Sequence, residues 1–303
     1  MVARRLQRVE APLGLRELPS AFKDAVAVEV CCGPKPGLVD PFSPHPNVDM
    51  DVLEFSRCLT AFKDCLEEAL EMGLEGEGPA ALARLIPAWN VDVMTEAGGP
   101  NTVRGVLFLG ALYCYSAGLS GDPLPFDTVR EVAPEIVSEF ERCSHTKCGR
   151  RRIEEGLPGV LGEALSGFVT VRTVSVPVLV RVLARTGSLG RAVVASTLAC
   201  MVVIEDAGLS EGERRFVRSM ASKAMRGEAE LDELVSVFDS VGVKPAAAAD
   251  VTAVGLAVVG VRYGRDVFSP YRDPERGLGG GEMGEHGEDS GPGGWNEGRG
   301  LRG

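Results

Sequence analysis

Four short polar blocks, each followed by an apolar stretch with helical spacing, constrain the fold of this chain more than any other feature. They lie at residues 34–40 with 49–51, 98–105, 162–168 and 244–250. Each block mixes turn-forming residues with a charged or amide side chain. Such blocks place polar groups on loops and helix starts, with a rigid scaffold behind them. The pattern predicts a helical protein with a polar pocket formed by loops and helix N-termini.

The stretch after the first block shows the helical spacing most clearly. Asp49 and Asp51 precede apolar residues that recur every three or four positions, which gives a helix one buried face. These apolar residues are Val52, Phe55, Leu59, Phe62, Leu66 and Leu70. Both acids would lie in the first turn of the helix, where the helix dipole favours negative charge.

Start and stop signals predict the other helices. Pro79 suits a first helical turn, and Pro87 should bend the same helix. Asn101 or Thr102 should cap a helix that ends at Gly118, and Ser188 should cap a helix that reaches Asp206. Ser210 and Glu213 should form a capping box for a helix that ends near Gly227, and Pro245 should open the last helix. Residues 169–176 instead alternate and are rich in β-branched side chains, so we expect an extended linker there.

These signals predict an all-α fold with a single compact multi-helix domain over residues 20–265. Residues 1–19 are expected to be a weakly structured lead-in. Residues 275–303 are rich in glycine and acids and have little to bury, so a disordered tail is expected.

Composition limits the partners and the compartment. The formal net charge of −11 argues against nonspecific binding to nucleic acid or to an anionic membrane. No stretch reaches the roughly 18 unbroken apolar residues of a membrane span, and the start lacks the apolar segment of a secretory signal. We therefore expect a cytoplasmic protein. Glutamine occurs once, at Gln7, a scarcity of thermolabile amides that is typical of heat-adapted proteins.

The first block has residues suited to a nucleotide. Gly37 and the two flanking prolines fix a turn that could hold Lys35, and a lysine ammonium is a point-charge partner for a triphosphate. Asp49 and Asp51, together with Asp40, offer hard oxygen ligands for the Mg²⁺ that ATP would bring. Alternatively, Lys35 is a solvated loop charge and the acids are helix-start residues.

In their order and spacing, the blocks resemble the triphosphoribosyl-dephospho-CoA synthase family over roughly residues 20–262. The first block keeps Pro-Lys-Pro-Gly-Leu-Val-Asp and, eight residues later, Asp-Met-Asp. Asn101, Thr102 and Gly105 match the second family motif, where Val103 replaces His and Arg104 replaces Lys. Gly162, Glu163, Gly167 and Phe168 match the third, and Pro245 and Asp250 match the last.

The resemblance implies a transferase that joins ATP to dephospho-CoA and releases adenine. It implies phosphate or nucleotide binding by Lys35, Gly37, Asn101, Thr102, Arg104, Gly105 and Asp250, with Mg²⁺ on Asp40, Asp49 and Asp51. Glu163 would be the carboxylate that stabilises positive charge at the ribose anomeric carbon or deprotonates the attacking hydroxyl. Asp206, the remnant of another family element, would be a second catalytic acid or a metal ligand, although a helix-end acid before Gly208 explains it equally well. Simple helix capping and packing explain several of these residues equally well.

Two other hypotheses stay open. The changed motif positions suit a protein that binds a nucleotide or a CoA-like ligand and regulates or scaffolds another process. A purely structural helical protein explains the helices but not the clustering of polar residues at their starts. The sequence predicts neither the acceptor nor the oligomeric state.

Overall fold

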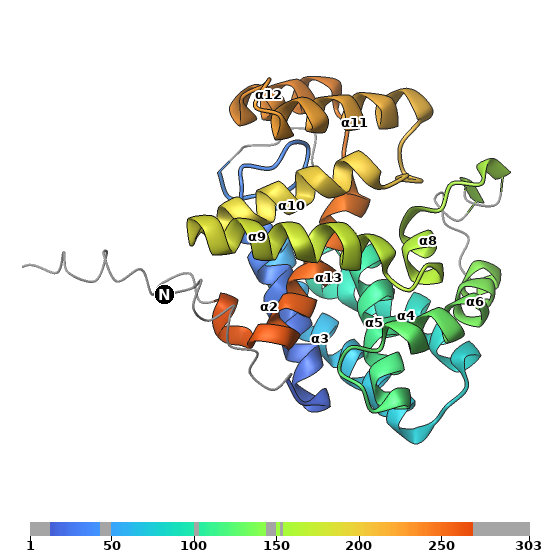
Figure 1. Ribbon diagram of the computed structural model, residues 1–303. Helices are drawn as coiled ribbons and strands as arrows, with labels where there is room; N and C mark the ends of the chain where they lie inside the picture. Colours follow the sequence, from blue (N-terminus) through green and yellow to red (C-terminus); the bar gives the residue numbers. More distant parts are fainter. Residues whose placement is uncertain (1–12, 43–49, 100–102, 144–149, 152–153, 269–303) are drawn as a thin grey trace, which may run out of the picture. The chain divides into compact units, whose positions relative to one another are not determined.

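The computed structural model describes residues 13–42, 50–99, 103–143, 150–151 and 154–268, and within them it contains helices and loops but no β-strand (Figure 1). The predicted all-α fold is confirmed. These residues belong to one compact unit, residues 1–269. The predicted tail lies outside the described residues. Helical structure begins at Leu15, inside the segment that we assigned to the lead-in.

The helices follow one another along the chain with short connections. The first half of the chain contributes η1 (Leu15–Glu17), α2 (Leu18–Cys31), α3 (Val52–Glu75), α4 (Pro79–Ala97), α5 (Arg104–Ser120) and α6 (Phe126–Cys143). The second half contributes α8 (Gly159–Leu165), the π-helical turn η2 (Val171–Ser175), α9 (Val176–Thr186), α10 (Leu189–Val203), α11 (Glu211–Met225), α12 (Leu231–Val241), α13 (Ala246–Tyr263) and η3 (Arg265–Phe268).

Side-chain caps set several helix starts: Ser188 and Ser210 cap helices as predicted, whereas Asp51 precedes α3 as its cap and does not lie in its first turn. The Asp51 side chain accepts the Glu54 N–H, and Glu54 in turn accepts the Asp51 N–H, which forms a capping box at α3. Ser188 accepts an N–H at the start of α10, and Ser210 forms a capping box at α11. Each of these contacts satisfies backbone donors that a helix leaves unpaired at its N-terminus.

The helix after the second block differs from the prediction. Val103 precedes α5 without a side-chain cap, and Asn101 and Thr102 lie outside the described residues. The helix ends at Gly121, which has φ +72°, rather than at Gly118. Gly118 is instead buried inside α5, where a Cβ would lie 2.4 Å from the Leu70 carbonyl oxygen of α3. This glycine therefore serves close helix packing and does not end the helix.

The extended linker predicted at residues 169–176 is wrong. The segment is helical, with the turn η2 leading directly into α9. Val171 and Val176 are buried, and the buried Ser175 hydroxyl lies 2.9 Å from that of Ser196 on α10. Tertiary packing has overridden the β propensity of the branched side chains.

Helix α13 lies at the centre of the fold and packs against α2, α5, α9 and α10 (Figure 1). It is the one described helix that is long and apolar enough to cross a membrane, but 72% of that stretch is buried inside the protein. Burial on several sides explains why it is apolar around most of its circumference. Pro245 immediately precedes this helix and Asp250 lies near its start, so the core helix also positions the last polar block.

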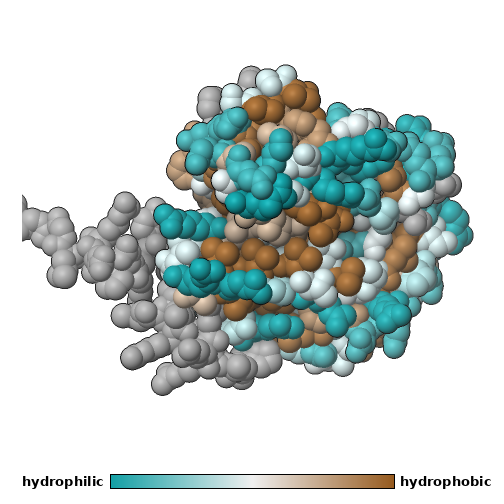
Figure 2. All heavy atoms as spheres, turned by 45° about the horizontal axis from the view of Figure 1, so that its top comes forward, coloured by the Kyte–Doolittle hydropathy of each residue, from teal (hydrophilic) through white to brown (hydrophobic). Residues whose placement is uncertain are grey.

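The surface is mixed. On the face shown in Figure 2, an apolar band lies between hydrophilic residues. Most apolar side chains form one continuous core that includes residues of every α-helix from α2 to α13. A charged side chain buried in this apolar core is costly unless it is paired or hydrogen-bonded.

We predict that Gly118→Ala lowers the free energy of unfolding by about 1–3 kcal/mol, because the new methyl group would force α3 and α5 apart. Gly190→Ala is the matched control, since a Cβ on Gly190 of α10 meets nothing within 4 Å. That control should change stability by less than about 1 kcal/mol. Urea denaturation of both variants checks this, and equal effects would contradict the packing role of Gly118.

Candidate active site

Four charged side chains are buried among the described residues: Glu29, Lys35, Asp40 and Glu163. Three of them belong to the polar blocks that the sequence analysis singled out. Glu29 was missed. Its signal in the sequence is a lone acid between Val26 and Val30 on a helix that is otherwise apolar there.

Lys35 and Glu29 form a buried ion pair. The Lys35 ammonium nitrogen lies 2.6 Å from Glu29 Oε1 and also donates to the Glu29 carbonyl oxygen at 2.5 Å. Lys35 is only 1% exposed, so the alternative of a solvated loop charge is wrong. Burial raises the pKa of the Glu29 carboxyl, and the neighbouring ammonium opposes that rise.

Asp40 organises the loop that carries Lys35. Its Oδ2 accepts the Lys35 N–H at 2.7 Å, and its Oδ1 accepts the Phe42 N–H at 2.8 Å. Gly37 has φ +69°, and a Cβ there would lie 2.2 Å from the Val243 carbonyl oxygen. Gly37 thus lets the loop pack closely against the connection between α12 and α13.

The loop, α2, α5 and α13 enclose a cavity of about 120 Å³. Its charged lining residues are Glu29, Lys35, Lys244 and Asp250, and its apolar lining includes Phe55 and Val106. The first and last polar blocks therefore meet at one place beside the start of α5, although they are far apart in the sequence.

Asp250 reaches this cavity from α13 by lying against the first turn of α5. Its carboxyl accepts the Val106 N–H, and a Cβ on Gly105 would lie 1.9 Å from Asp250 Oδ2. Only a glycine at position 105 admits the carboxyl to this helix start. Burial raises the pKa of Asp250 to about 8, with the negative charges of Asp206 and Glu29 adding to the rise and the Val106 N–H opposing it. At neutral pH the protonated acid therefore predominates.

Arg104 precedes that glycine but points elsewhere. It is exposed, and its guanidinium lies 3.9 Å from the Met94 sulfur. It is not among the residues that line the cavity. The second block therefore contributes Gly105, which lies against Asp250, whereas its Arg104 side chain lies at the surface.

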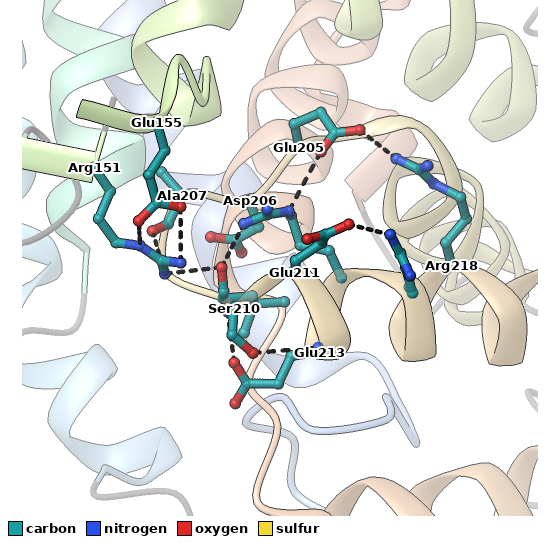
Figure 3. A network of polar contacts seen from close by, with 12 residues as sticks. Arg151, Glu155, Glu205, Asp206, Ala207, Ser210, Glu211, Glu213 and Arg218 are labelled. Atoms are coloured by element: carbon teal, nitrogen blue, oxygen red, sulfur yellow. Dashed lines mark hydrogen bonds and ion pairs between the residues drawn. The ribbon is translucent and has the colours of Figure 1, made fainter. Parts of the chain in front are cut away.

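Asp206 holds the start of α13. Its Oδ1 accepts the Gly208 N–H at 2.7 Å, and its Oδ2 accepts the Ala247 N–H at 3.1 Å. In the same loop, Arg151 donates to the Ala207 carbonyl oxygen (Figure 3). Arg151 and Arg214 both donate to the Leu209 carbonyl oxygen. Burial raises the pKa of Asp206, while these amides and the two guanidinium groups oppose the rise. Asp206 thus fixes the helix that carries Asp250.

Glu163 also meets backbone amides. Its Oε1 accepts the Val171 N–H at 2.9 Å, at the start of the helical segment that follows the third block. Burial raises the pKa of Glu163, and hydrogen bonds from Thr170 and Val171 oppose the rise. Glu163 is not among the residues that line the cavity. The structure therefore brings Lys35, Gly37 and Asp250 together at the cavity, whereas Glu163 does not line it.

Of the three acids expected to hold Mg²⁺, the two that the structure describes make different contacts. Both Asp40 oxygens accept loop amides, Asp51 caps α3 at the surface, and Asp49 lies outside the described residues. Within the part of the chain that the structure describes, no group of three His, Cys, Asp or Glu side chains is placed to hold a metal ion.

Comparison with known proteins gives a consistent result. A sequence model of the ATP:dephospho-CoA triphosphoribosyl transferase family matches residues 15–266. The chain is 31% identical over 222 residues to a 2-(5''-triphosphoribosyl)-3'-dephosphocoenzyme-A synthase of Klebsiella pneumoniae, covering 68% of this chain and 73% of the relative. It is 30% identical over 276 residues to the protein of that name from Escherichia fergusonii, covering 80% and 90%. No solved structure matches.

We predict that the stability advantage of the wild type over Asp250→Asn decreases between about pH 4 and pH 8. Because the pKa of Asp250 is raised in the folded protein, folding favours the protonated acid. The resulting contribution to the free energy of unfolding is complete below the ordinary pKa of 3.8 and is lost as the pH rises through about 8. The slope should not exceed about 1.4 kcal/mol per pH unit. Chemical denaturation of both proteins at pH 5, 7 and 9 checks this, and a difference that is independent of pH would contradict it.

Proposed function

Because the chain belongs to the ATP:dephospho-CoA triphosphoribosyl transferase family, we propose that it transfers the triphosphoribosyl group of ATP to dephospho-CoA and releases adenine. The observation that carries this proposal is the family match over residues 15–266, which spans every helix from η1 to α13. The alternative of a regulatory nucleotide-binding protein is not favoured, since the relatives are named as synthases.

The reaction exchanges one bond at the ribose anomeric carbon. The bond from this carbon to adenine N9 breaks, and a bond to the oxygen of an acceptor hydroxyl, which we assign to the 2′-hydroxyl of dephospho-CoA, forms. The triphosphate stays on the ribose. Positive charge develops on the sugar as adenine leaves, and nearby carboxyl groups stabilise such charge most strongly where water is excluded.

We assign this bond exchange to the cavity between α2, α5 and α13. A pocket for a drug-sized ligand occupies roughly 300–1,000 Å³, so a cavity of about 120 Å³ suits the sugar or the base and not the whole nucleotide. The triphosphate would extend from the cavity toward the start of α5. Arg104 is exposed there and can form a bidentate contact with phosphate oxygens. Asn101 and Thr102 remain predicted phosphate ligands in the same block.

The Lys35 ammonium has a different role in this account. It neutralises Glu29 within the cavity, and the phosphates are left to Arg104 and to Lys244, which also lines the cavity. Lys35 then acts on the nucleotide through the position and charge of Glu29.

Magnesium enters this proposal as part of the MgATP substrate. We assign the contact with this ion to Asp51, which lies at the exposed start of α3. The carboxylate of Asp40 accepts loop amides with both oxygens and suits a structural role better. We also propose a cytoplasmic location, where ATP is available and free thiols such as Cys58 and Cys114 stay reduced.

The first test is chromatographic detection of adenine after incubation of the protein with ATP, Mg²⁺ and dephospho-CoA. Adenine should appear only when the acceptor is present. Adenine that never appears, or that appears equally without the acceptor, would contradict a transferase.

A second expected outcome concerns the triphosphate. Arg104→Ala should raise the KM for ATP by about tenfold with little change in kcat, because a phosphate contact acts on ground state and transition state alike. Arg185→Ala, which removes an exposed arginine of α9, is the matched control. Similar KM values for both variants would exclude Arg104 as a phosphate ligand.

A further inference from the structure

Two carboxyl groups line the same cavity, and only one of them has an ammonium group within ion-pair distance. Glu29, on α2, has the Lys35 ammonium at 2.6 Å. Asp250, on α13, accepts the Val106 N–H and faces the negative charges of Asp206 and Glu29. A pair of acids whose surroundings differ in this way can divide the donor and acceptor roles of acid–base catalysis.

The charged groups around Asp250 come from several elements. Glu29 faces it from α2, Asp206 from the loop after α10, and Lys35 and Lys244 line the same cavity. Arg151 and Arg214 lie beyond Asp206 and act chiefly on that residue. The pKa of Asp250 is raised to about 8 in these surroundings, so the acid keeps its proton at neutral pH.

We propose that Asp250 donates a proton to the departing adenine and that Glu29 accepts the proton of the attacking hydroxyl. This inference rests on the proposed transferase function and assigns two catalytic residues to it. Neither the resemblance nor the family match assigns either role.

Each proton and electron pair in this reaction has a defined donor and acceptor. As the bond from the anomeric carbon to N9 breaks, its electron pair stays on adenine, and a ring nitrogen takes the Asp250 proton. The acceptor oxygen bonds to the anomeric carbon, and its proton moves to Glu29. After product release, a proton passes from Glu29 to Asp250 within the cavity, which restores both groups without any further reactant.

The other acids near the blocks are less suited to these roles. Both oxygens of Asp206 accept backbone amides, from Gly208 and Ala247, and Glu163 accepts the Val171 N–H and does not line the cavity. Asp250 and Glu29, in contrast, line the cavity itself. Gly105 is required because it admits Asp250 to the helix start.

A change of leaving group tests the acid. The two substrates are ATP and ribose 5-triphosphate carrying 4-nitrophenol at the anomeric carbon, since 4-nitrophenolate departs without a proton. Asp250→Asn keeps an oxygen for the Val106 N–H, and it should slow adenine release by about 100-fold or more but 4-nitrophenolate release by less than about threefold. Equal slowing of both, or of neither, would overturn the assignment of Asp250.

The base has its own test. Glu29→Gln should slow transfer to dephospho-CoA about 100-fold or more with either leaving group, because the attacking hydroxyl still has to lose its proton. With azide as the nucleophile, which has no proton to lose, the variant should react about as fast as the wild type. Equal slowing with both nucleophiles would overturn the assignment of Glu29. Asp232→Asn, an exposed change on α12, is the control for both series.

The wild-type pH profile gives a second measurement if a variant fails to fold. The rate with ATP should fall above about pH 8, whereas the rate with the 4-nitrophenyl substrate should not. Profiles with the same alkaline limb would overturn the donor role. A wild type that releases no adenine overturns the proposed function itself, whereas an active wild type with an equally active Asp250→Asn overturns only this inference.

Discussion

The contact between the Asp250 carboxyl and the first turn of α5 is the interaction on which the rest of the site depends. It joins the central helix α13 to α5 at a point where the chain has no side chain, since a Cβ on Gly105 would lie 1.9 Å from Asp250 Oδ2. Asp206 fixes the same end of α13 by accepting the Ala247 N–H. Gly37 lets the loop that carries Lys35 pack against the Val243 carbonyl oxygen, just before α13 begins. Three polar blocks thus come together because two glycines, Gly37 and Gly105, leave room for close contacts.

The protein stabilises its interior acids mainly with backbone amides. Asp40, Glu163 and Asp206 each accept main-chain N–H groups at a loop or a helix start. Such donors satisfy a buried carboxylate without the desolvation cost of a second charge. Glu29 is the exception, because it has the Lys35 ammonium as its partner. This exception lies at the cavity, where an uneven charge distribution is of most use to catalysis.

Much of the fold could be predicted because its determinants are local. Asp51, Ser188 and Ser210 cap helices through residues three positions away, and that spacing is visible in the sequence. The segment 169–176 was mispredicted because its conformation is set by packing against α10 and α13, which local propensity does not encode. Gly118 was misassigned for a related reason, since its role depends on the Leu70 carbonyl of another helix.

The candidate site could be predicted in part. Lys35, Gly37, Gly105 and Asp250 lie in the blocks and meet in space. Glu29 lies in no block and becomes significant only through its contact with Lys35. Glu163 accepts the Val171 N–H at a helix start and does not line the cavity, so its role at the ribose stays a prediction. Sequence patterns identify polar residues, but the distances between helices decide which of them share a site.

The central claim is that Asp250 is held as a neutral acid in this cavity. Carbon-13 NMR of aspartate side-chain carboxyl groups tests it most directly, with the Asp250 signal assigned by its loss in Asp250→Asn. We predict a titration midpoint near pH 8, since burial and the charges of Asp206 and Glu29 raise the pKa of this group to about 8. A midpoint near the ordinary value of 3.8 would contradict the account.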